Sequence, residues 1–239
     1  MKVTVVIPMY NESKIIQKTA ECLSSYMSEN FEEYQIIFSD DGSTDGCADI
    51  VNGLGLPCVR VLSYEQNRGK GCAVRNGMMA ADGDVCIFTD ADLAYGTDVI
   101  KKATEAFVEK PMADMLIGSR NLDVNGYDGY TLSRKLMSKA YIRVLCIVGG
   151  FRLSDSQCGF KAFRKDAAKK IFSECTVDGF AFDFEVILRA GIHKLDVEEM
   201  PVRVINHRES SVRPIGDAFK MLGDVKRIKK QIKREKARK

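Results

Sequence analysis

Val85-Cys86-Ile87-Phe88-Thr89-Asp90-Ala91-Asp92 is the stretch of sequence that indicates the fold. Four consecutive apolar residues, 85–88, are typical of a strand buried on both faces, as in a parallel sheet covered by helices. Ligands of open α/β sheets bind beyond the carboxyl ends of the strands, which is where Asp90 and Asp92 stand. Two carboxylates in one loop suit Mg²⁺ or Mn²⁺ bound to a substrate's phosphates. The alternative for this pair alone is an ordinary turn, where Asp is common.

The same strand-and-helix pattern covers the chain up to residue 118. Strands are predicted at residues 3–8, 34–38, 58–62, 85–88 and 115–118, and helices separate most of them. Pro8 is predicted to end the first strand, and Asn11 to cap the helix after it. The inner stripe of that helix would contain Ile15, Ile16, Ala20, Leu23 and Met27. This order predicts an α/β fold with a doubly wound, mainly parallel sheet and helices on both faces.

From about residue 120 the pattern becomes less regular. Residues 121–130 are polar and contain glycine, which is typical of a loop that closes over a site. A helix is predicted near 132–145, another begins at 180–185, residues 196–206 resemble a strand, and a helix follows from 215. We therefore expect one domain, 1–225, with a first half, 1–119, a second half, 120–225, and a basic tail, 226–239.

Length and composition limit the class of protein. At 239 residues and 45% hydrophobic content the chain can fill a core, and no apolar run approaches the roughly 18–20 residues that cross a bilayer. The N-terminus lacks the pattern of a signal peptide. Eight cysteines without C-x-x-C spacing indicate buried thiols rather than disulfides or a zinc site. These features predict a cytoplasmic protein.

Charge is distributed unevenly along the chain. Residues 226–239 contain nine Lys or Arg and one Glu, a net charge of +8, which leaves −5 for residues 1–225. A basic tail on an acidic body does not predict a nucleic-acid-binding face. An apolar helical stripe runs from residue 218 into this tail. It is formed by Ala218, Met221, Leu222, Val225, Ile228 and Ile232. Such a helix either lies on an anionic membrane surface, as a peripheral anchor, or packs on the domain.

Three strand ends carry acidic or polar clusters: Pro8-Met9-Tyr10-Asn11-Glu12, Asp40-Asp41 and Asp90-Ala91-Asp92. One such end is ordinary, whereas three in one sheet indicate a shared ligand-binding edge. Gly69-Lys70-Gly71 precedes a helix and is predicted to cradle a phosphate, with Lys70 as a point charge. The loop lacks the Walker spacing, so an ordinary turn is the alternative.

Four stretches in this order resemble glycosyltransferase family 2: Val6-Ile7-Pro8-Met9-Tyr10-Asn11-Glu12, Asp40-Asp41-Gly42-Ser43-Thr44-Asp45, Asn67-Arg68-Gly69-Lys70-Gly71 and Asp90-Ala91-Asp92. The resemblance implies a GT-A fold, with a nucleotide sugar bound in the first half. It places the nucleotide against Pro8, Tyr10, Asn11, Glu12, Asp40, Asp41, Lys70, Asp90, Ala91 and Asp92. By this resemblance Asp41 holds the base, and Asp92, with Asp90, binds Mg²⁺ or Mn²⁺.

The second half narrows the resemblance to dolichyl-phosphate glucosyltransferases and bacterial polyprenyl-phosphate relatives, over about residues 2–225. The stretches that carry it are Gly118-Ser119-Arg120, Asp155-Ser156-Gln157-Cys158-Gly159-Phe160-Lys161 and Phe182-Asp183-Phe184-Glu185. It implies inverting transfer of a hexose, glucose first, from a nucleotide sugar, UDP-glucose first, to a polyprenyl phosphate. Ala94 replaces a metal-binding Gln of mannosyl members, and Ser210-Ser211-Val212 replaces their Ser-Lys-Leu, with Arg208 or Arg213 as substitute cations. The membrane segment of many relatives is missing.

The acceptor decides which side chains serve catalysis. A phosphate acceptor is already anionic and needs cations to hold it. Arg120, Arg134 and Ser138 offer such a site, with Arg134 and Ser138 four apart on one face of a predicted helix. Gln157 is a further predicted acceptor residue, and Leu136, Tyr141 and Val144 lie along the same helix for the lipid chain. A hydroxyl acceptor on a glycan or protein instead needs a carboxylate base, for which Asp183 and Glu185 are candidates. We expect Asp92, Asp183 and Arg120 to be catalytic. A nucleotidyltransferase or a phospho-receiver module fits the four motifs less well.

Overall fold

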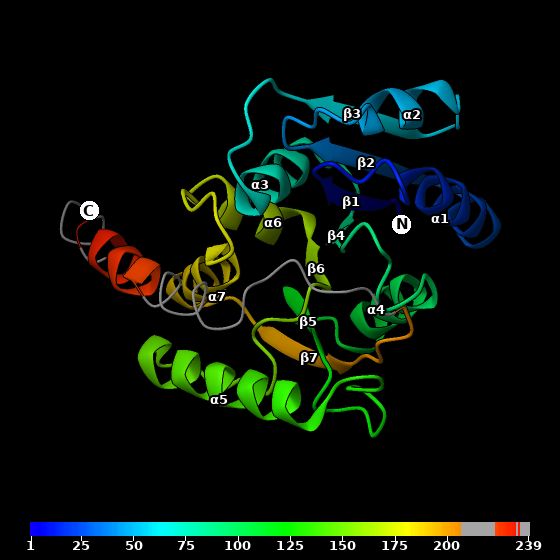
Figure 1. Ribbon diagram of the computed structural model, residues 1–239. Coiled ribbons are helices and arrows are strands. Elements are labelled where there is room, and N and C mark those ends of the chain that lie inside the picture. The colour runs from blue at the N-terminus through cyan, green and yellow to red at the C-terminus, as the bar shows by residue number, and fades with distance from the viewer. Residues whose placement is uncertain (207–222, 233, 235–239) are drawn as a thin grey trace.

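One mixed sheet of seven strands organises the computed structural model, which describes residues 1–206, 223–232 and 234 (Figure 1). The strands lie in the order β3-β2-β1-β4-β6-β5-β7. Their bounds are β1 Val3–Met9, β2 Tyr34–Asp40, β3 Val59–Ser63, β4 Val85–Phe88, β5 Met115–Ser119, β6 Lys161–Arg164 and β7 Val197–Pro201. The five strands predicted up to residue 118 are all present, and β7 begins in the strand-like segment 196–206.

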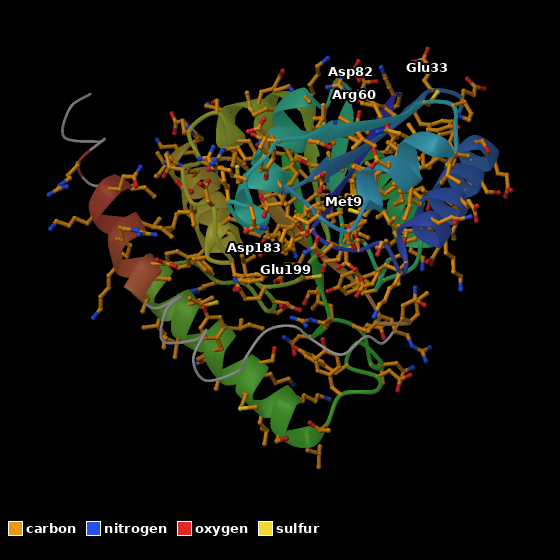
Figure 2. The ribbon with its side chains drawn as sticks, turned by 45° about the horizontal axis from the view of Figure 1, so that its top comes forward. Met9, Glu33, Arg60, Asp82, Asp183 and Glu199 are labelled. Carbon is orange, nitrogen blue, oxygen red and sulfur yellow. The ribbon has the colours of Figure 1, made fainter. Side chains whose placement is uncertain are left out.

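The strands β3, β2, β1 and β4 run parallel, so their carboxyl ends meet at one edge of the sheet. Met9, labelled in Figure 2, is the last residue of β1 and pairs with Asp40, the last residue of β2. Pro8 does not end β1, as the sequence predicted, but lies inside it opposite Ser39. Pairing of β1 with β4 stops at Val6, so β1 pairs on one side only at Pro8, where a missing N–H is tolerated.

The strand β6 was not predicted, and it determines how the two halves join. It lies antiparallel between β4 and β5, with Lys161 opposite Phe88 on one side and Ile117 on the other. A strand of four residues with Lys at one end and Arg at the other lacks the apolar alternation that predicts a strand. Because β6 bridges β4 and β5, the second half extends the first sheet.

Helices cover both faces of the sheet (Figure 1). One core includes residues of α1 Ile16–Asn30, α2 Cys47–Gly53 and α4 Asp98–Glu109, and the other includes residues of α3 Lys70–Ala80, α5 Leu132–Gly149, α6 Lys165–Phe172 and α7 Phe182–Ile192. The predicted stripe of α1 is confirmed, because Ile16, Ala20, Leu23 and Met27 are buried and Ile15 packs against them. The short helices α2 and α6 were not predicted.

Residues 223–232 form a helix that crosses the predicted boundary between domain and tail. Val225, Ile228 and Ile232 are buried in the second core, so the apolar stripe of this helix packs on the protein. Lys226 and Lys229 are exposed on it. No described helix combines the length and the apolar character needed to cross a membrane. Arg208, residues 210–212 and Arg213 lie outside the described residues.

Candidate functional site

The loops that follow β1 and β2 are joined through Asn11. Its backbone N–H donates to Ser43 Oγ at 2.9 Å, and its side-chain Oδ1 accepts from the backbone N–H of Thr44 at 2.9 Å. Asn11 has a φ of 53°, in the left-handed region, and the N-cap of α1 is Ile15. The prediction that Asn11 caps α1 is therefore wrong. Its side chain bridges two loops, a contact between residues 33 positions apart that no helix pattern indicates.

Asp41 fixes the loop that leads into α3. Its buried carboxylate accepts from the backbone N–H groups of Arg68 at 3.0 Å and Gly69 at 2.7 Å. Asn67 Nδ2 donates to the same carboxylate at 2.8 Å, and so does the hydroxyl of Tyr64. Burial and the neighbouring Asp41 raise the pKa of Tyr64, so the phenol stays a donor. Asp41 thus positions residues 64–69, and base binding by Asp41 stays a prediction.

The other residues predicted to bind the base lie in β1 and β2 or directly after β1. Asp40 is buried and accepts from the backbone N–H of Ser43 at 3.1 Å and from the Ser43 hydroxyl. Pro8 is buried in β1, whereas Tyr10 is exposed and Glu12 is half-buried. Tyr10 and Glu12 are therefore accessible to a ligand at this edge of the sheet. Their contact with a nucleotide stays a prediction.

The glycines of Gly69-Lys70-Gly71 are required by protein packing. A Cβ on Gly69 would lie 2.4 Å from the carbonyl oxygen of Asp178, and a Cβ on Gly71 would lie 2.4 Å from that of Val177. The backbone N–H of Gly71 also donates to the Asp178 carbonyl, at 2.8 Å. The amides of both glycines are thus bonded within the protein and do not form the predicted phosphate cradle. The Lys70 side chain is what this loop presents to the site.

Lys70 Nζ and Asp90 Oδ1 form an ion pair of 2.5 Å at the carboxyl end of β4. The side chains are 25% and 32% exposed, so water screens the pair only in part. Burial lowers the pKa of Lys70, but Asp90 and then Asp183 raise it more, so the ammonium stays protonated. Gly159 packs on the other side of the carboxylate, where a Cβ would lie 2.2 Å from Asp90 Oδ2. Asp90 thus lies between Lys70 and Gly159, and the adjacent Ala91 is buried.

Asp92 lies in a turn that is held by the segment 205–206. Its Oδ1 accepts from the backbone N–H of Ala94 at 3.0 Å, and Leu93 between them has a φ of 47°, uncommon for a residue with a side chain. Asn206 Nδ2 donates to the carbonyls of Asp92 at 3.2 Å and Leu93 at 2.9 Å. The backbone N–H of Ile205 donates to the Ala94 carbonyl at 2.8 Å. Asn206 was not predicted as a site residue, because its partners lie more than 110 residues away.

Asp183, at the start of α7 and labelled in Figure 2, is paired with a buried lysine that was not predicted as a site residue. Lys161 Nζ lies 2.6 Å from Asp183 Oδ1 and donates to the Cys158 carbonyl at 2.7 Å. The Lys161 side chain is fully buried. Burial raises the pKa of Asp183, and Lys161 and Lys70 oppose that rise. These charges show that Asp183, Lys70 and Asp90 belong to one electrostatic cluster.

Glu185, the second candidate base, is used by the fold. Its carboxylate accepts from the backbone N–H groups of Thr176 at 2.9 Å and Val177 at 2.8 Å. It also forms an ion pair of 2.8 Å with Arg189, and both side chains are buried. A carboxylate with these partners anchors the loop 176–177 against α7. Asp183, in contrast, lies close enough to Lys70 and Asp90 for their charges to act on its carboxyl.

Arg120 is buried in an ion pair with Asp155. Nε lies 2.6 Å from Asp155 Oδ2, and Nη2 donates to Oδ1 at 2.9 Å. Nη1 donates to the hydroxyl of Tyr130 at 3.3 Å, and the guanidinium lies 5.2 Å from the ring centroid of Tyr127. The loop with Asp155 is held in turn by Glu199 of β7, labelled in Figure 2, which accepts from the Asp155 N–H at 3.0 Å. Arg120 thus joins the loop 121–130 to the loop 154–158.

The remaining predicted acceptor residues lie on α5 and beside Asp155. Ser138 is half-exposed on α5, and the backbone of Arg134 belongs to the same helix, while its side chain lies outside the described part of the structure. The backbone N–H of Gln157 donates to Asp155 Oδ1 at 3.3 Å. Helix α5 exposes several large apolar side chains, namely Leu132, Leu136, Met137, Val144 and Ile147. Acceptor binding by these residues stays a prediction.

Asp90 and Asp92 are the donor set for the predicted divalent cation. Carboxylate oxygens are the ligands that Mg²⁺ and Mn²⁺ prefer. Among the described residues, no group of three or more His, Cys, Asp or Glu is arranged to hold a metal ion. Two carboxylates would leave the remaining ligands of such a cation to a substrate's phosphates, an arrangement common for Mg²⁺, and metal binding by this pair stays a prediction.

These features define a mainly parallel α/β enzyme fold with a carboxylate pair and a lysine at the carboxyl edge of the sheet. The model of the family described as Glycosyl transferase family 2 matches residues 4–172, and the chain belongs to this family. The family resemblance noted in the sequence is thereby confirmed, and the protein is a glycosyltransferase.

Relatives extend the match over the second half. A dolichyl-phosphate beta-glucosyltransferase of Trichomonas vaginalis is 31% identical over 236 residues, which cover 94% of this chain and 70% of that protein. The enzyme of the same name from Saccharomyces cerevisiae is 30% identical, covering 93% and 72%. Glucosyl-3-phosphoglycerate synthase from Mycobacterium tuberculosis, solved with Mn²⁺ and UDP, has a TM-score of 0.68 at 18% identity, covering 95% and 78%. This structural likeness confirms the GT-A fold.

Proposed function

We propose that this chain transfers glucose from UDP-glucose to a polyprenyl phosphate, with inversion and with the assistance of Mg²⁺ or Mn²⁺. The observation that carries the proposal is three relatives named dolichyl-phosphate beta-glucosyltransferase, each of which matches at least 93% of this chain. The name of these relatives gives the sugar and the acceptor. The site described above supplies a carboxylate pair, Asp90 and Asp92, for the metal that such a donor needs.

The carboxylate pair and Lys70 each have a part in this reaction. Asp90 and Asp92 would hold the divalent cation, which would supply Lewis-acid stabilisation of the diphosphate leaving group. Lys70 adds a positive charge beside it, and such charges count for more in a partly shielded site. One oxygen of the acceptor phosphate forms the new bond to the anomeric carbon while the bond to the diphosphate breaks, which inverts that carbon.

An anionic acceptor also suits the state of Asp183. A phosphate has no proton to lose before it attacks, whereas a hydroxyl acceptor needs a base in contact with it. Asp183 is already paired with the buried Lys161 at 2.6 Å, and the other candidate, Glu185, is bonded to the fold. These pairings favour the phosphate acceptor over a hydroxyl acceptor on a glycan or protein.

The surface of α5 supports a lipid-linked acceptor. A groove of about 800 Å³ lies beside α5, lined by Asn121, Lys139, Ile142, Arg143, Cys146, Ile147, Gly150, Phe151, Arg152, Leu153 and Ser154. Three of these residues are cations, and most of the others are apolar. Such a lining suits an anionic headgroup joined to a hydrocarbon chain.

The test compares two lipids that differ only in the reacting group. Radiolabelled UDP-glucose and Mg²⁺ are incubated with a short-chain polyprenyl phosphate or with the corresponding polyprenol. We expect glucosylated lipid from the phosphate and none from the alcohol. Transfer to the alcohol or to a glycan, with none to the phosphate, would overturn the acceptor. GDP binding tighter than UDP binding, measured by calorimetry, would overturn the donor.

A further inference from the structure

The proposed metal ligand Asp90 already has a cation of the protein's own. Lys70 Nζ lies 2.5 Å from its Oδ1, and each side chain is about one-third exposed or less. Gly159 blocks the opposite side, since even a Cβ there would lie 2.2 Å from Oδ2. Asp90 therefore has little room to turn away from Lys70. A divalent cation at Oδ1 and the ammonium of Lys70 compete for the same oxygen.

The two lysines of the cluster differ in their freedom to move. Lys161 is fully buried, and its ammonium contacts Asp183, the Cys158 carbonyl and the ring of Phe88, whose centroid is 5.5 Å away. Lys70 is 25% exposed and begins α3, so its long side chain reaches solvent as well as Asp90. Lys161 pairs with Asp183, whereas Lys70 pairs with Asp90. A metal ion that binds Asp90 therefore has to displace Lys70.

We propose that Lys70 is an exchangeable counter-ion of the metal site: it holds Asp90 in the empty enzyme and moves to the diphosphate of the donor when the metal takes its place. This inference rests on the proposed metal-assisted function and adds that Lys70 changes its partner when the metal and the nucleotide bind. Within the protein Lys70 is paired with Asp90, with Asp183 as a further attracting charge, and the two carboxylates alone offer an incomplete metal shell. A nucleoside diphosphate supplies both a new anionic partner for Lys70 and the missing metal ligands. Metal and nucleotide therefore bind cooperatively, and by linkage each strengthens the other by the same factor.

The experiment measures Mn²⁺ affinity by calorimetry, and free Mn²⁺ by electron paramagnetic resonance, with and without saturating UDP. The wild-type enzyme is expected to bind Mn²⁺ weakly alone and at least about tenfold more tightly with UDP, within the range usual for coupled sites. Lys70→Met should bind Mn²⁺ alone about tenfold more tightly than wild type and gain less from UDP. Lys70→Gln, which keeps a polar head, repeats the test if the methionine variant does not fold. Lys70→Arg should retain the wild-type coupling.

The matched control is Lys102→Met. Lys102 forms an ion pair of the same length, 2.5 Å, with Asp98, but the side chains are 62% and 58% exposed on α4. This variant should bind Mn²⁺ like the wild type. If neither neutral Lys70 variant binds Mn²⁺ alone more tightly than Lys102→Met does, while UDP still promotes binding, the counter-ion inference is overturned and the proposed function stands. If the wild type binds no Mn²⁺ even with UDP, the metal-assisted function is overturned, and the inference with it.

Discussion

Replacing Arg120 by Gln separates a structural role from a role in acceptor binding. The sequence alone assigned Arg120 to the acceptor's phosphate, whereas the structure places it 7% exposed in a bidentate pair with a fully buried carboxylate, Asp155. Removing one partner of a buried pair leaves an uncompensated charge and typically costs about 3–5 kcal/mol. The lost stacking on Tyr127 adds to this cost.

The matched control is Arg203→Gln. Arg203 pairs with Asp128 at 2.8 Å, a distance like that of the buried pair, but the side chains are 48% and 53% exposed. Exposed pairs contribute about 0–1 kcal/mol, because water screens them and both side chains lose freedom. Replacing Arg by Gln should therefore lower the free energy of unfolding several times more at Arg120 than at Arg203.

Urea unfolding of the wild type and both variants, followed by circular dichroism, measures this difference. For an m-value near 3 kcal/mol per molar, the upper part of the usual range, the Arg120→Gln midpoint falls by about 1–1.7 M. Arg203→Gln should move it by about 0.3 M or less. Equal midpoints for the two variants would refute the reasoning. Loss of transfer to polyprenyl phosphate at unchanged stability would instead return Arg120 to the acceptor site.

Three further predictions concern the metal, a buried thiol and the tail. Asp92→Asn should lower kcat by about 10²–10³-fold, as loss of other electrostatic stabilisers does, and full turnover in excess EDTA would contradict the metal requirement. Burial raises the pKa of Cys86 from 9.0 to about 11. The free energy of unfolding that this shift contributes is fully present below pH 9, and it is lost as the pH rises through 11. Cys86→Ala should accordingly lose less unfolding free energy than the wild type between pH 8 and pH 11, measured with urea; an equal loss would count against this assignment. Changing the exposed Lys226, Lys229 and Lys230 to Ser should weaken the free energy of binding to anionic vesicles by about 3 kcal/mol, near 1 kcal/mol per lysine. Sedimentation with the vesicles measures this binding. Unchanged sedimentation would remove the membrane role of the tail.

The sequence by itself determined the first half of the fold and the position of its chemistry. Runs of apolar residues mark β1, β2 and β4, and the stripe of α1 follows from helical spacing. These are local patterns, so each can be recognised without its partner. Because parallel strands end at a common edge, the positions of Asp40 and Asp90 followed from the same patterns. The order of the motifs was enough to identify the family.

Only the tertiary structure decided which charges find partners. Lys70 and Asp90 are 20 positions apart, Lys161 and Asp183 are 22 apart, and Arg120 and Asp155 are 35 apart. A lysine in a four-residue strand has the pattern of a surface position, yet β6 lies between two strands and buries Lys161 completely. The roles of these side chains depend on strand order and loop packing, which are set by contacts between distant segments, and no local spacing records those contacts.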